Sequence, residues 1–100
     1  MNLSVKYKGK PVSIDGQEYI LPSMSARVVE RLMEMEKAGD VWQQYGVMLE
    51  LIYVTLKRNY PELTLEELKD KVEAVQVNDL FRSLLEASGM AKTDPNAVSP

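Results

Sequence analysis

Hydrophobic and polar residues alternate over the first 22 positions of the chain, which is the spacing of a half-buried β-strand. Val5 and Tyr7 alternate with lysines, and a second alternating run leads to Asp15-Gly16, a strong signal for a type I′ hairpin turn. We therefore predict a two- or three-stranded meander with a single inward face. The residues predicted on that face are Val5, Tyr7, Val12, Ile14, Tyr19 and Leu21. A sheet this small is marginally stable alone, so it needs helices to pack against.

Four helical patterns follow the predicted strands. The first runs from Met24 to Ala38, with Gly39 as its stop, and the second opens at an Asp40/Gln43 capping box and runs to about Asn59. The third spans Leu65 to about Ala74, and the fourth follows an Asn78 cap and ends at Gly89. The apolar face predicted for the first helix consists of Val28, Val29, Leu32, Met33 and Met35. That of the third helix consists of Leu65, Leu68 and Val72, and that of the fourth consists of Leu80, Phe81, Leu84 and Leu85.

The second helix has more apolar surface than a small domain can cover. Its polar positions form only a thin stripe, made by Gln43, Gly46, Glu50 and Lys57. We expect it to be the central helix or one face of an interface, with part of its apolar surface left open. The candidate partner-binding residues are Trp42, Tyr45, Met48, Leu49 and Tyr53. Such a surface also predicts self-association when no partner is present.

The stretch "LKRNYPELTLEELKD", residues 56 to 70, contains both a helix stop and a helix start. Pro61 disfavours α geometry at Tyr60, so the preceding helix should end near Asn59. Thr64 and Glu67 form a T-x-x-E capping box for the next helix.

These elements predict a mainly α, α+β fold in which a small N-terminal β-hairpin or meander packs on a bundle of about four helices. We expect one domain over residues 1–89, with a β-hairpin region at 1–22 and a helical region at 24–89. Residues 90–100 carry two prolines and no apolar periodicity, which indicates a disordered tail.

Composition argues against an enzyme or a metal protein. The 100 residues include no cysteine and no histidine, which removes the commonest zinc ligands and the commonest general base. Glu30 with Glu34, and Glu66 and Glu67 with Asp70, lie on polar helix faces, where solvated surface is a better interpretation than a catalytic pair. Nucleotide-binding and nucleophile motifs are absent from the sequence. We expect no catalysis and no cofactor.

Charge and hydropathy predict neither a nucleic-acid nor a membrane partner. The net charge is −3, and the helix after the Pro61 turn is rich in glutamate, so phosphates would repel it. Lys6, Lys8 and Lys10 fit either a phosphate-binding row or, as we favour, protection of an exposed strand edge. The longest apolar run, "LIYV" at 51–54, is far too short for a membrane span, and we expect a soluble cytoplasmic protein.

The run "LELIYVTLKRNYPELTLEELKDKVE", with "NDLFRSLLEASG" after it, resembles the tail assembly chaperones of long-tailed bacteriophages. In that family an apolar helix leads into an R-N-Y-P-x-L/V-T-x-E-E turn. The matching residues here are Arg58, Asn59, Tyr60, Pro61, Thr64 and Glu67, within a similarity over about residues 45 to 89.

The resemblance implies a phage or prophage assembly factor in the cytoplasm of the bacterial host, absent from the mature virion. Its partners would be the tape measure protein and the tail tube protein, and it would form a homo-oligomer. Two alternatives remain open from the sequence. One is a small helical DNA-binding or regulatory phage protein, and the other is a minor virion structural protein such as a tail connector.

Overall fold

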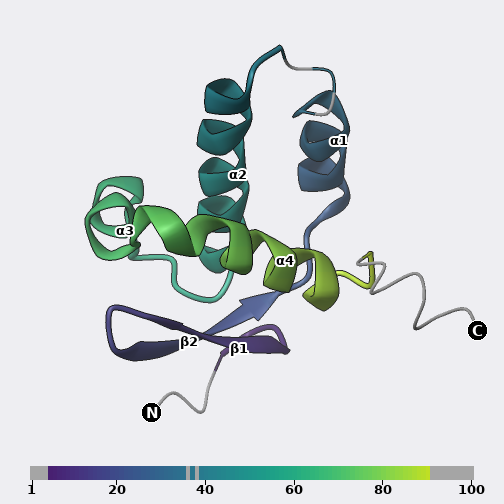
Figure 1. Cartoon of the computed structure of the whole chain (residues 1–100). Helices are drawn as coiled ribbons and strands as arrows, with labels where there is room; N and C mark the ends of the chain where they lie inside the picture. Colours follow the sequence, from purple (N-terminus) through teal and green to yellow (C-terminus); the bar gives the residue numbers. More distant parts are fainter. Residues whose placement is uncertain (1–4, 36, 38, 91–100) are drawn as a thin grey trace, which may run out of the picture.

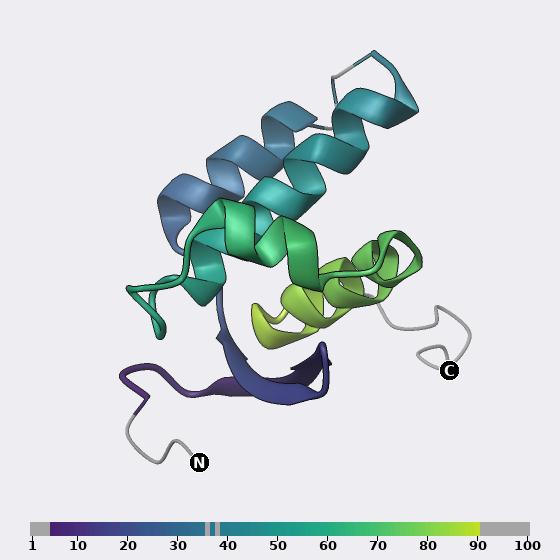
Figure 2. The same cartoon turned by 90° about the vertical axis from the view of Figure 1, so that its left-hand side faces the viewer.

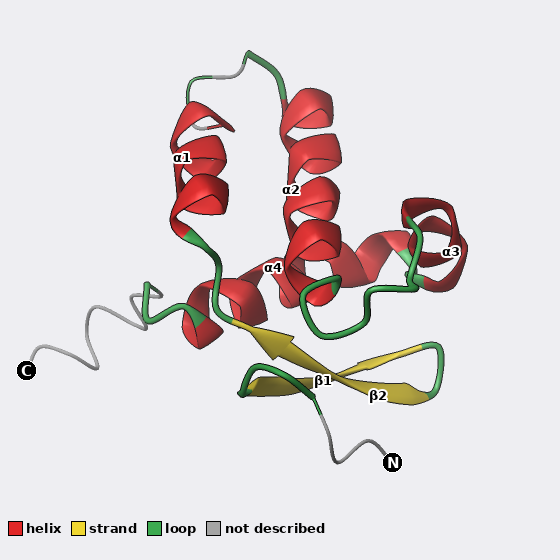
Figure 3. Cartoon of the chain, turned by 180° about the vertical axis from the view of Figure 1, so that it is seen from behind, coloured by secondary structure: helices red, strands yellow, loops and turns green. Residues whose placement is uncertain are grey.

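The computed structural model describes residues 5–35, 37 and 39–90, which form a β-hairpin followed by four α-helices (Figure 1). The bounds are β1 Gly9–Ile14, β2 Gln17–Pro22, α1 Ala26–Met35, α2 Val41–Leu56, α3 Leu65–Lys71, the 3₁₀ turn η1 Ala74–Gln76, and α4 Val77–Ala87. The helices α1 and α2 lie side by side, α4 crosses their lower part, and the hairpin packs beneath α4 (Figures 1 and 3). The predicted α+β fold is therefore confirmed.

The hairpin has the predicted turn and the predicted inward face. Asp15 and Gly16 both have positive φ, 54° and 78°, as a type I′ turn requires. The strands are antiparallel, with Ile14 opposite Gln17 and Pro11 opposite Ile20. Four residues predicted to face inward are buried: Val12, Ile14, Tyr19 and Leu21.

The predicted strand at Val5 and Tyr7 is wrong, because β1 begins only at Gly9 and both residues are half-buried outside the ladder. The backbone N–H and C=O of Tyr7 are bonded to the side chain of Asn59 instead of to a neighbouring strand. The predicted meander is thus a two-stranded hairpin with a separate leading segment. Residues 1–4 lie outside the described part of the chain.

Several helix boundaries differ from the prediction. The first helix ends at Met35, before the predicted Ala38, and the second ends at Leu56, before the predicted Asn59. The first helix starts at Ala26 because the Ser25 hydroxyl accepts the Val28 N–H and caps it, so Met24 is a buried residue before the helix. The third helix ends at Lys71, since Val72 turns extended (φ −88°, ψ 126°).

Asn78 is not a cap, because η1 runs directly into α4 and places Asn78 in its first turn. Two predicted caps and one predicted stop are present. Asp40 accepts the Gln43 N–H, the Thr64/Glu67 capping box is complete, and Gly89 ends the last helix with a φ of 73°. Ala38 and most of the predicted tail, residues 91–100, lie outside the described residues.

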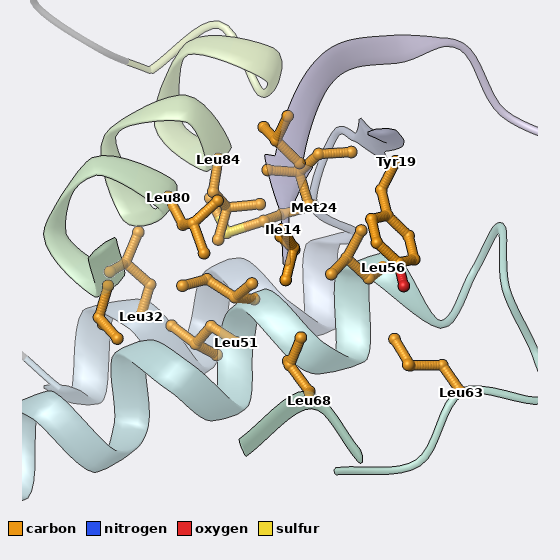
Figure 4. Close-up of a cluster of buried hydrophobic side chains, with 14 residues drawn as sticks. Ile14, Tyr19, Met24, Leu32, Leu51, Leu56, Leu63, Leu68, Leu80 and Leu84 are labelled. Atoms are coloured by element: carbon orange, nitrogen blue, oxygen red, sulfur yellow. The ribbon is translucent and has the colours of Figure 1, made fainter. Parts of the chain in front are cut away.

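The core lies where α2, α4 and the hairpin meet (Figure 4). Its buried hydrophobic residues are Val12, Ile14, Tyr19, Leu21, Met24, Leu32, Leu51, Ile52, Leu56, Leu63, Leu68, Val77, Leu80 and Leu84. Thr55 on α2 is fully buried with them, and its hydroxyl has no hydrogen-bond partner among the residues that the structure describes. A buried hydroxyl without a partner loses its hydration without compensation, so this position costs stability.

We predict that Thr55→Val raises the free energy of unfolding by about 1 kcal/mol, because it removes the unpaired hydroxyl while keeping the branched shape. The hydroxyl of Thr64 accepts the Glu67 N–H at 3.1 Å. Thr64→Val should therefore lower the free energy of unfolding by about 1 kcal/mol, because the helix cap is lost. Urea unfolding of both variants compares the same substitution at a buried position and at a helix cap. A destabilised Thr55→Val protein would contradict the burial argument.

Candidate protein-binding surface

One apolar stripe of α2 is covered at its lower end and open at its upper end. Val41, Tyr45, Met48 and Ile52 recur at helical spacing and therefore share a stripe. Ile52, nearest the C-terminal end of α2, is fully buried, whereas Tyr45 and Met48 are half-buried and Val41 is 65% exposed. Because α4 crosses only the lower part of α2, it does not cover this upper end, which has α1 beside it (Figure 1).

A second stripe, through Trp42, Leu49, Tyr53 and Leu56, has the same gradient. Leu56 is fully buried, Leu49 and Tyr53 are half-buried, and Trp42 is 79% exposed. Tyr53 also has a structural role, since its hydroxyl donates to the Leu63 carbonyl at 3.1 Å. The five candidate residues thus lie on two stripes. Trp42 is the most accessible of them, and Tyr53 belongs partly to the fold.

The helix α1 adds an exposed methionine to the same end of the helix pair. Met33 was predicted to face inward, but it is 61% exposed. The inward face of α1 is centred on buried Leu32, and the Arg31–Glu50 ion pair, at 3.0 Å, holds α1 against α2. We define the apical surface as Met33, Val41, Trp42, Tyr45 and Met48. It lies on the part of the α1–α2 pair that projects past α3 and α4 (Figure 2).

The R-N-Y-P turn lies at the opposite end of α2 and joins the helix to the hairpin. The Asn59 side-chain amide accepts the Tyr7 N–H at 2.7 Å and donates to the carbonyls of Tyr7 and Ile20, at 2.9 and 3.1 Å. The Tyr60 hydroxyl accepts the Ile20 N–H at 2.7 Å. Together the two side chains pair both backbone groups of Ile20.

Arg58 completes this attachment. Its Nη1 donates to the Ser23 carbonyl at 2.9 Å, and its guanidinium lies 4.1 Å from the centre of the Tyr7 ring. The ring of Tyr60 packs edge-on against that of Tyr19, with centroids 5.1 Å apart. Pro61 is exposed and makes the turn, while Thr64 and Glu67 cap α3. The residues of the turn therefore have clear structural roles.

The acidic groups do not form a metal site within residues 5–35, 37 and 39–90, because no three of them are grouped closely enough to share an ion. Glu66 and Glu67 are exposed, as are Glu30 and Glu34. Within the same residues, no helix combines the length and the apolar character that crossing a bilayer requires.

We predict that Asn59→Ala lowers the free energy of unfolding by about 2–3 kcal/mol, because three hydrogen bonds are lost and partly buried backbone groups are left unpaired. Asn78→Ala is the matched control. Asn78 is exposed in the first turn of α4 and should change stability by less than about 0.5 kcal/mol. Equal effects of the two substitutions in urea unfolding would refute the structural role of Asn59.

Tyr7 should titrate earlier than an ordinary tyrosine. The Arg58 guanidinium beside the ring, together with the charge of Lys6, lowers the pKa of the Tyr7 phenol. Because the folded-state pKa is below the unfolded value, this group stabilises the fold increasingly as pH rises through the folded pKa, and the contribution disappears as pH falls below it. Alkaline absorbance titration should show an early phenol that is missing in Tyr7→Phe and moves back toward the ordinary range in Arg58→Gln, where Lys6 still lowers the pKa. An unchanged titration curve in Tyr7→Phe would contradict this.

No protein-family model, no curated protein and no solved structure matches this chain. A function must therefore be argued from the residues themselves. The two features that bear on it are the apical surface and the sequence around the R-N-Y-P turn.

Proposed function

We propose that this protein is a tail assembly chaperone of a long-tailed bacteriophage or prophage. In this role it binds the tape measure protein, tail tube subunits or both during tail morphogenesis, and it performs no catalysis. It acts in the cytoplasm of the bacterial host and is absent from the mature virion. The proposal begins from the resemblance of residues 45–89, whose central motif is Arg58-Asn59-Tyr60-Pro61 with Thr64 and Glu67.

The observation that carries the proposal is the exposure of large apolar side chains at one end of the α1–α2 pair. Met33, Val41 and Trp42 are each more than half exposed, and Tyr45 and Met48 on α2 are half-buried. Methionine side chains adapt to different partner shapes, and tryptophan and tyrosine are common anchors of protein interfaces. Such a surface suits an apolar helical segment, which would otherwise aggregate before it is assembled.

The structure gives less support to the regulatory alternative. A DNA-reading helix after the turn would be α3, whose first turn carries Glu66 and Glu67 and which lacks the basic face that phosphates require. The other alternative is a minor virion structural protein such as a tail connector, which would remain in the particle, unlike a chaperone. Mass spectrometry of purified particles separates those two, because a chaperone should be missing from them.

Co-expression tests the proposal. Wild-type protein should raise the soluble yield of the tape measure protein from the same genome and co-purify with it. Trp42→Ser should reduce both effects, whereas Val75→Ser should leave them unchanged, because Val75 is 86% exposed but lies between α3 and α4, outside the apical surface. Failure of the wild-type protein to associate with either tape measure or tail tube protein would refute the proposal.

The same surface predicts self-association when the partner is absent. Burying apolar surface against a second copy stabilises the assembly by roughly 25 cal/mol per Å². Self-association occurs when the total free energy of this burial exceeds the entropy cost of association. Sedimentation across a wide concentration range should show assemblies that Trp42→Ser weakens and Val75→Ser preserves. A weak dimer forms at protein concentrations of about hundreds of micromolar. A wild-type protein that stays monomeric at such concentrations would contradict this prediction.

A further inference from the structure

Three lysines and one arginine lie just after the C-terminal end of α2 and on the segment that precedes β1: Lys57 and Arg58, and Lys6 and Lys8. Lys6 Nζ lies 5.5 Å and Arg58 Cζ 4.1 Å from the centre of the same Tyr7 ring. Lys8 follows in the chain, and Lys57 lies over the ring of Tyr53 at 5.7 Å. Two cations thus converge on one aromatic ring, that of Tyr7.

Edge protection does not explain these lysines. The three lysines of the predicted row do not share a strand face, because Lys6 and Lys8 precede β1 and only Lys10 lies within it. Lys10 is paired with Glu86, so it has a partner within the fold. Lys6 and Lys8 are exposed and outside the β1–β2 ladder.

Within residues 5–35, 37 and 39–90, the ion pairs involve Lys10, Arg31 and Lys69, and none involves Lys6, Lys8, Lys57 or Arg58. The chain carries 15 acidic residues against 12 basic ones, so carboxylates are not scarce. Cations held near one another without a counter-charge repel, and an external anion would remove that repulsion. The lowered pKa of Tyr7 reports the same positive surroundings.

We propose that Lys6, Arg58 and the Tyr7 ring form a binding site for a carboxylate side chain of an acidic polypeptide segment. A guanidinium has five N–H donors, and the hydrogen bond from Nη1 to the Ser23 carbonyl leaves others available. Guanidinium–carboxylate bonds are charge-assisted and stronger than neutral ones. The site lies at the opposite end of α2 from the apical surface, and it does not depend on the proposed chaperone function.

A nucleic acid fits this site less well than an acidic peptide. A phosphate backbone is a continuous polyanion and needs an extended basic track. Here the chain turns acidic just after the site, with Glu62, Glu66 and Glu67 exposed within ten positions of Arg58. A short segment with a few carboxylates can use the cations without meeting those glutamates.

The experiment titrates the isotope-labelled full chain with an oligo-glutamate peptide and follows backbone amide shifts by NMR. Shifts are expected at residues 6–8 and 58–59, and they should weaken as salt is added. Lys6→Glu should weaken binding about tenfold, the change that ~1.4 kcal/mol produces. Lys6 belongs to no helix or strand, so unchanged helical circular dichroism should show that this variant still folds.

Lys37→Glu is the matched control, because Lys37 is an exposed lysine near the α1–α2 turn that undergoes the same charge reversal. It should bind the peptide nearly as well as the wild type. Three outcomes would overturn the proposal: no shifts at these residues, equal losses in the two variants, or tighter binding of a single-stranded oligonucleotide at the same residues.

Discussion

The side-chain amide of Asn59 makes the hydrogen bonds that a neighbouring strand would make at the open edge of the hairpin. Ile20 lies opposite Pro11, which has no N–H to donate, so the two residues form a non-hydrogen-bonded pair of the ladder. The backbone N–H and C=O of Ile20 therefore point away from β1, toward the open edge of the hairpin. Asn59 and Tyr60 pair both groups, and Asn59 also binds both backbone groups of Tyr7. On the other edge, Gln76 donates to the Ser13 carbonyl at 2.7 Å. An isolated two-stranded hairpin is marginal in water, and these bonds attach it to the helices while closing its edges.

This attachment determines which part of α2 stays open. The hairpin and α4 both pack at the C-terminal half of α2, where Leu51, Ile52 and Leu56 are buried. The N-terminal half has α1 beside it, which leaves Trp42 and Val41 exposed. A single helix therefore has a structural end and an apolar, accessible end. The R-N-Y-P residues belong to the structural end, where Arg58, Asn59 and Tyr60 bind the hairpin and the segment that precedes it.

The sequence predicted the features that depend on neighbouring residues. The Asp15-Gly16 turn, the Asp40 cap, the Thr64/Glu67 box and the Gly89 stop each depend on a few adjacent positions, and all are present. The surplus of apolar residues on α2 likewise indicated that part of the helix would stay exposed.

Contacts between residues far apart in the chain could not be predicted from the sequence. Asn59 and Tyr7 are 52 positions apart, and nothing in the local pattern of either residue indicates the other. The error at Val5 and Tyr7 has this origin, because alternation predicts a strand but does not show whether a neighbouring strand is available. Met33 was misplaced because helical spacing defines a broad apolar stripe, and only the packing of α1 on α2 decides which edge of it is covered.

The emission of Trp42 tests most directly whether the open end of α2 is the binding surface. Trp42 is the only tryptophan of the chain, so its fluorescence reports this site alone. Dilute protein should emit at the long wavelength of a solvated indole, and a purified tryptophan-free fragment of the tape measure protein should shift the emission to shorter wavelength as it binds. A fragment that binds, as shown by co-sedimentation, while leaving the Trp42 emission unchanged would place the interface elsewhere on the molecule.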